Sequence, residues 1–128
     1  MMTTDQTAGT PRKTILVVEE DDLVREVVCA MLCEHYTLLV ARNGVEALEL
    51  YALHSSQLQG VITDWRMPQK NGAAVVAHIR QENTSLPILV MSGDLSIQEA
   101  ERLKRDARVS LLRKPFLETD LLKMLEEW

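Results

Sequence analysis

The chain alternates between short apolar runs and longer amphipathic stretches, and this alternation limits the possible folds more than any other feature. Five runs of four or five residues are rich in Val, Ile and Leu. Short runs that are apolar throughout are typical of strands covered on both faces, as in a parallel sheet. We expect five such strands, at residues 14–18, 37–41, 60–63, 87–91 and 109–112.

An amphipathic stretch follows each of these runs and predicts a helix. Asn43 is suited to cap the second helix, and Ser96-Ile-Gln-Glu99 is a capping-box sequence that opens the fourth. In the second helix, the 3.6-residue period places Val45, Leu48 and Ala52 on one side, which we expect to be the buried one. The predicted helices cover residues 22–33, 44–53, 73–81, 96–105 and 117–127.

The order of these elements predicts an α/β fold in one domain. Consecutive parallel strands need a crossover helix between them, so strict alternation indicates a parallel sheet with helices on both faces. A chain of 128 residues is long enough for one domain of ordinary size. We expect the domain to occupy residues 14–128 and the polar, aperiodic residues 1–13 to form a flexible tail. No glycine-rich loop follows the first strand, which disfavours a dinucleotide-binding domain.

Charge, hydropathy and cysteine usage narrow the functional class. The net charge of −5 disfavours binding to nucleic acid by this chain. No apolar run approaches the length of a membrane span, and the N-terminus lacks the pattern of a signal peptide, so we expect a cytoplasmic protein. Cys29 and Cys33 lie four residues apart in a predicted helix, and we interpret both as small buried side chains rather than as zinc ligands.

Charged and hydroxyl side chains follow four of the five predicted strands. The first strand ends in Glu19-Glu20-Asp21-Asp22, the third at Asp64, the fourth at Ser92 and the fifth at Lys114. Ligands of open α/β sheets bind at the carboxyl ends of the strands, so we expect these side chains to converge. Carboxylates that hold Mg²⁺, together with an ammonium and a hydroxyl, suit the handling of a phosphoryl group. Taken singly, each residue has an ordinary alternative role in capping, in a turn or on the surface.

Five segments of the chain resemble the receiver domains of two-component response regulators, in the same order, from about residue 14 to the end. The resemblance implies a flavodoxin-like, doubly wound (βα)5 fold with the strand order 2-1-3-4-5. It also implies a signalling module that catalyses only its own phosphorylation and dephosphorylation and is not an enzyme with a separate substrate. The segments are ILVVEEDDLVREVV, ARNGVEALEL, VITDWRMPQKNG, PILVMSG and LLRKPF.

The resemblance assigns the phosphorylation chemistry to individual residues. It implies that Asp64 accepts the phosphoryl group and that Ser92 and Lys114 contact the phosphoryl oxygens. It also implies that the Lys114–Pro115 peptide is cis, which is compatible with a proline directly after a strand.

The resemblance also implies a Mg²⁺ site beside the phosphoacceptor. Its ligands are the carboxylates of Glu20 and Asp64 and the main-chain carbonyl of Arg66, with Glu19 acting through water. At the position of Glu20 the family usually has aspartate, which is one methylene shorter. Because Mg²⁺ requires nearly ideal octahedral geometry, we expect a lower Mg²⁺ affinity than in a typical receiver domain.

A second departure from the family lies on the fifth strand. Three residues before the lysine, the family usually has an aromatic side chain that moves when the hydroxyl residue moves. Here the position is occupied by Leu111, which has neither a ring nor a hydroxyl. We therefore expect any signal to travel through backbone shifts of the fourth helix and its flanking loop.

The implied partners are a sensor histidine kinase or a histidine phosphotransfer protein, and an output protein or domain that the sequence does not identify. Two other functions stay open. The chain could dock partners without phosphorylation, with Glu20 and Leu111 as signs of lost switching. It could also be a Mg²⁺-dependent phosphohydrolase that attacks through Asp64, although such an enzyme needs a second acid and Arg66 stands at the convenient position.

Overall fold

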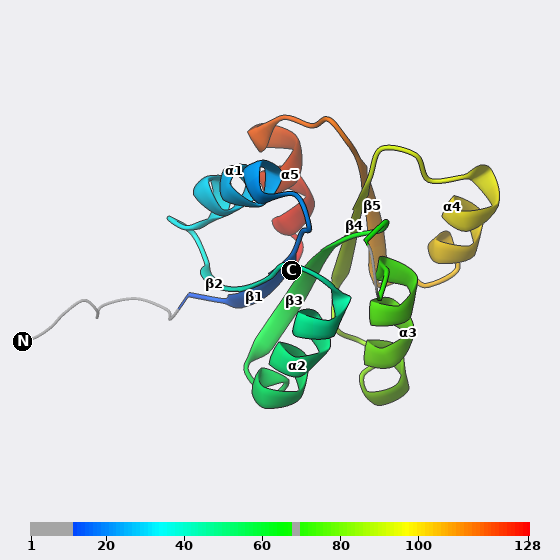
Figure 1. Cartoon of the computed structure of the whole chain (residues 1–128), viewed down its shortest axis with the longest axis horizontal. Helices are drawn as coiled ribbons and strands as arrows, with labels where there is room; N and C mark the ends of the chain where they lie inside the picture. The colour runs from blue at the N-terminus through cyan, green and yellow to red at the C-terminus, as the bar shows by residue number, and fades with distance from the viewer. Residues whose placement is uncertain (1–11, 68–69) are drawn as a thin grey trace, which may run out of the picture.

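The computed structural model describes residues 12–67 and 70–128, so the predicted tail lies outside the described residues apart from Arg12 and Lys13. Ten elements alternate along the chain, as predicted (Figure 1). The strands are β1 (Thr14–Val18), β2 (Thr37–Ala41), β3 (Leu58–Asp64), β4 (Ile88–Ser92) and β5 (Val109–Arg113). The helices are α1 (Asp22–Leu32), α2 (Gly44–His54), α3 (Gly72–Glu82), α4 (Ile97–Lys104) and α5 (Glu118–Leu125).

The five strands form one parallel sheet in the order β2-β1-β3-β4-β5, which confirms the predicted fold class and strand order. Helices α1 and α5 cover one face, and α2, α3 and α4 cover the other (Figure 1). Successive strand residues point to opposite faces. In β1, Ile15 and Val17 pack under α1 and α5, whereas Leu16 and Val18 pack under the other three helices. Because both faces of the strands are buried, nearly every residue along them is apolar.

The predicted helix caps are present and fix where the helices begin. The Asn43 side chain accepts a hydrogen bond from the main-chain N–H of Glu46 at 2.9 Å. At the start of α4, Ser96 Oγ accepts from the Glu99 N–H and Glu99 Oε1 accepts from the Ser96 N–H, both at 3.0 Å. Asp21 caps α1 by accepting from the Val24 N–H at 3.0 Å. These caps satisfy N–H groups that have no partner within the helix.

Two predictions about burial are wrong. In α2 the buried side chains are Ala47 and Tyr51, while Val45 is 37% exposed and Ala52 is also exposed. This helix carries apolar residues on all sides, so the period alone does not identify its buried face. Cys33 is exposed because it follows the last residue of α1, beyond the face that packs on the sheet.

The C-terminal residue packs against the middle of the sheet. A Cβ atom on Gly60 of β3 would lie 2.2 Å from two ring carbons of Trp128. Only glycine leaves room for this close approach of the indole to the strand. Among the described residues, no helix has the length and apolar character needed to cross a membrane.

Candidate functional site

The predicted site residues lie at the carboxyl edge of the sheet. Asp64 and Ser92 are the last residues of β3 and β4, and Glu19 and Lys114 directly follow β1 and β5. The main-chain hydrogen bonding continues past the strands: the Glu19 N–H donates to Ala41 at 3.1 Å, and the Lys114 N–H donates to Ser92 at 2.9 Å. The sheet thus holds the backbone beneath these side chains in place.

One ammonium group joins two of the predicted carboxylates. Lys114 Nζ lies 2.7 Å from Glu19 Oε1 and 3.3 Å from Asp64 Oδ1. The Glu19 side chain is 1% exposed, and that of Asp64 is 12% exposed. Burial acts to lower the pKa of Lys114, but its hydrogen bond to Glu19 and the charge of Asp64 outweigh this and raise that pKa. Lys114 is therefore a fixed positive charge at the end of β5.

The carboxyl group of Asp64 holds its proton more tightly than an ordinary aspartate does. Burial and, after it, the nearby charge of Glu19 raise the pKa of Asp64 to about 6, against the opposing effect of Lys114. Two carboxylates share one ammonium here, so the site carries an excess of negative charge once both are ionised. Oxygen ligands with excess negative charge fit a hard divalent cation such as Mg²⁺.

The structure does not group Glu20 with these residues. Glu20 is exposed, and across residues 12–67 and 70–128 no three His, Cys, Asp or Glu side chains are arranged to hold a metal ion. Glu19, which was expected to act through water, is the acid beside Asp64. The direct ligand role of Glu20 therefore stays a prediction, as does that of the Arg66 carbonyl.

Arg25 on α1 organises the acidic loop, a role that the sequence pattern does not reveal. Its guanidinium donates to the main-chain carbonyls of Glu19 at 3.0 Å and Glu20 at 3.3 Å, and it pairs with Asp22 at 2.6 Å. The Asp21 N–H also donates to Glu19 Oε2 at 3.0 Å. The only signal in the sequence is a basic residue three positions after an acid, a spacing that brings the two together on a helix.

The hydroxyl of Ser92 has a partner that was not predicted. Ser92 is buried, and its Oγ donates to Asp94 Oδ1 at 3.3 Å while it accepts from the Asp94 N–H at 3.2 Å. Asp94 in turn pairs with the Arg66 guanidinium, whose Nε lies 3.1 Å from both carboxylate oxygens. The predicted cis peptide between Lys114 and Pro115 is present. Leu111 and Ser92 line the same cavity.

Comparison with known proteins identifies close similarity over nearly the whole chain. A sequence model described as the response regulator receiver domain matches residues 15–126. The transcriptional regulatory protein PdtaR of Mycobacterium tuberculosis is 33% identical over 126 residues, which cover 97% of this chain and 60% of PdtaR. The chain spans only part of the first curated relatives that it matches, from 13% to 60% of their length.

Solved structures show the same fold. The chemotaxis protein CheY4 of Vibrio cholerae superimposes with a TM-score of 0.82 at 26% identity, covering 91% of this chain and 98% of CheY4. The receiver domain of the sensor histidine kinase PA1611 of Pseudomonas aeruginosa has a TM-score of 0.78 at 24% identity, covering 92% of this chain and 98% of that one. The latter structure is described with a magnesium ion coordinated in the active site cleft.

Proposed function

This chain belongs to the response regulator receiver domain family of two-component systems, and from this premise we propose that Mg²⁺-dependent phosphorylation of Asp64 switches its interactions. The observation that carries the proposal is the bridge from Lys114 to both Glu19 and Asp64 at the carboxyl edge of the sheet. It supports the proposal because a buried carboxylate, a fixed cation and a second acid lie together at the end of β3.

The proposed reaction moves a phosphoryl group from a phosphohistidine to Asp64. The P–N bond of the donor breaks, its electron pair stays on the leaving imidazole, and an oxygen of Asp64 forms the new P–O bond. Asp64 must be ionised to attack. Lys114 stays protonated because its pKa is raised, and its ammonium offsets charge on the phosphoryl oxygens. In the hydrolysis that follows, water takes up the phosphoryl group, inorganic phosphate leaves, and the Asp64 carboxylate is restored.

Mg²⁺ would be held by Asp64 and Glu19, with Glu20 and the Arg66 carbonyl as the further predicted ligands. When bound, the ion offsets negative charge on the phosphoryl oxygens. The two carboxylates around one ammonium support this assignment, because burial and the charge of Glu19 raise the pKa of Asp64 even beside Lys114. The magnesium ion described for the PA1611 receiver domain is consistent with a cation at this edge of the fold.

The proposed partners are a sensor histidine kinase or a histidine phosphotransfer protein as donor, and an output protein or domain as receiver of the signal. We infer no separate substrate, because the phosphoryl group ends on Asp64, which is part of the protein itself.

Incubation with acetyl phosphate and Mg²⁺ tests the proposal. We expect wild type to show a retarded band on a phosphate-affinity gel, and neither the Asp64→Asn variant nor an EDTA-treated sample to show one. A chain that binds partners but gives no such band is instead a phosphorylation-independent docking module. Repeated turnover of phosphate esters that depends on Asp64 identifies a phosphohydrolase, which overturns the proposal.

A further inference from the structure

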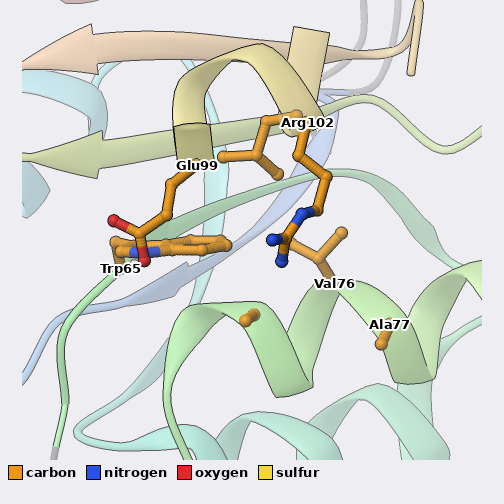
Figure 2. A pocket seen from close by; sticks show the side chains of 7 residues that line it. Trp65, Val76, Ala77, Glu99 and Arg102 are labelled. Atoms are coloured by element: carbon orange, nitrogen blue, oxygen red, sulfur yellow. The ribbon is translucent and has the colours of Figure 1, made fainter. Parts of the chain in front are cut away.

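The two residues after the phosphoacceptor are both attached to helix α4 through Glu99. Trp65 Nε1 donates to Glu99 Oε2 at 3.0 Å, and Arg66 Nη2 donates to Glu99 Oε1 at 3.1 Å. Figure 2 shows the Glu99 carboxylate on α4 directly beside the Trp65 indole, at one end of the pocket between α3 and α4. Because Glu99 also caps α4 by accepting from the Ser96 N–H, one carboxylate joins the loop after β3 to the first turn of the helix.

Glu99 keeps its charge over the whole physiological range. Its hydrogen bonds from the main chain of Ser96 and from the Trp65 indole lower the pKa of Glu99 to about 2. Its contacts with Trp65 and Arg66 are therefore charge-assisted hydrogen bonds, which are stronger than neutral ones.

The second connection runs from Ser92 through Asp94 to Arg66. The Ser92 hydroxyl has one proton, which is directed to Asp94 Oδ1. Asp94 is held by Arg66, and Arg66 is held by Glu99. The hydroxyl proton cannot be donated to Asp94 and to a phosphoryl oxygen on Asp64 at the same time. Phosphorylation of Asp64 therefore competes with Asp94 for Ser92.

We propose that Asp94 is a positioning residue that holds the Ser92 hydroxyl in the unmodified protein, and that Glu99, through Trp65 and Arg66, passes the loss of this contact to α4. The inference rests on the proposed phosphorylation of Asp64. The unmodified protein has the Ser92–Asp94 contact and the modified protein lacks it. This difference defines two states whose populations phosphorylation can shift. The contacts need no aromatic ring on β5, so they operate with Leu111 in place.

The size of the effect follows from the exposure of the groups. The Arg66 and Asp94 side chains are 54% and 68% exposed, so their ion pair contributes little by itself. Trp65 is 7% exposed, so its hydrogen bond to Glu99 is better shielded from water. We expect removal of either carboxylate contact to shift the equilibrium between the two states by a factor of about three to ten.

Titration with beryllium fluoride, a phosphoryl mimic, at saturating Mg²⁺ tests the inference by NMR. The Ser92 amide reports occupancy of the site, and the amides of residues 97–100 report the response of α4. We expect Asp94→Ala to lower the half-saturating concentration about three- to tenfold, because it removes the oxygen that accepts from the Ser92 hydroxyl and so releases Ser92. We expect Trp65→Phe, which leaves the α4 capping box intact, to keep the response at Ser92 and to weaken the response in α4, because it removes one of the two contacts that attach the loop to Glu99.

Glu101→Gln is the matched control, because Glu101 is an exposed acid on the same helix. It should behave as wild type. An unchanged half-saturating concentration in Asp94→Ala, or a full α4 response in Trp65→Phe, overturns this inference and leaves the proposed function in place. No response at Ser92 in wild type overturns both.

Discussion

Replacing Asp64 with Asn should stabilise the unmodified protein, and the gain should depend on pH. Burial and the charge of Glu19 raise the pKa of Asp64 from 3.8 to about 6. The folded state therefore binds this proton more tightly than the unfolded state does. For such a group, stability is highest below the unfolded pKa and is lost as the pH rises through the folded pKa. At neutral pH Asp64 is ionised, so the folded wild-type protein carries the full free-energy cost of this buried charge. The Asp64→Asn variant avoids it.

The magnitude follows from the pKa values. A rise from 3.8 to about 6 corresponds to about 3 kcal/mol, at about 1.4 kcal/mol for each pH unit. The Asp64 side chain retains 12% exposure, so solvent screens part of this cost. We expect Asp64→Asn to raise the free energy of unfolding by about 2 kcal/mol at neutral pH and by less than about 1 kcal/mol near pH 4.

Urea denaturation in EDTA at both pH values measures the difference. Asp22→Asn is the control, because Asp22 is 85% exposed and pairs with Arg25 at the surface. The free energy of unfolding of this control should fall by up to about 1 kcal/mol at neutral pH, whereas that of Asp64→Asn should rise. A gain in Asp64→Asn that is equal at both pH values, or a loss at neutral pH, refutes the account of charge excess at the site.

Three further substitutions test other parts of the structure. Glu20→Asp is expected to tighten Mg²⁺ binding, because the shorter carboxylate suits octahedral geometry better; an unchanged affinity, measured by tryptophan fluorescence, contradicts this. Lys114→Met leaves the buried Glu19 carboxylate without its cation, so the free energy of unfolding should fall by about 3 kcal/mol. Adding Glu19→Gln should recover part of this loss. If Lys114→Met alone is as stable as wild type in urea, the ion pair does not stabilise the protein. Gly60→Ala forces a methyl group into the Trp128 ring and should lower the free energy of unfolding, measured by thermal unfolding, by about 1 to 3 kcal/mol. The loss should be smaller in a protein that also carries Trp128→Ala. Equal losses with and without Trp128 exclude the contact.

The sheet could be predicted from the sequence because the physics that forms it is local. Strands covered on both faces are short apolar runs, and the caps at Asn43 and Ser96 lie within three residues of their partners. The α2 face was not predictable in the same way. Val45, Leu48 and Leu53 accompany Ala47 and Tyr51 around the whole helix, so only the sheet decides which of them are buried.

The site was predictable in position but not in its contacts. Parallel strands bring Asp64, Ser92 and Lys114 to one edge, which follows from topology alone. The ion pair between Lys114 and Glu19 joins residues 95 positions apart, and the bond between Trp65 and Glu99 spans 34 positions. Such contacts depend on the relative placement of whole elements, which residue spacing does not encode.

The most direct test of the central claim is the intact and peptide mass of the protein after treatment with acetyl phosphate and Mg²⁺. Phosphorylation at Asp64 predicts the addition of one phosphoryl group, located by fragmentation to the peptide that contains Asp64 and absent from Asp64→Asn. A phosphoryl group that persists in this variant, or none in wild type, contradicts the claim.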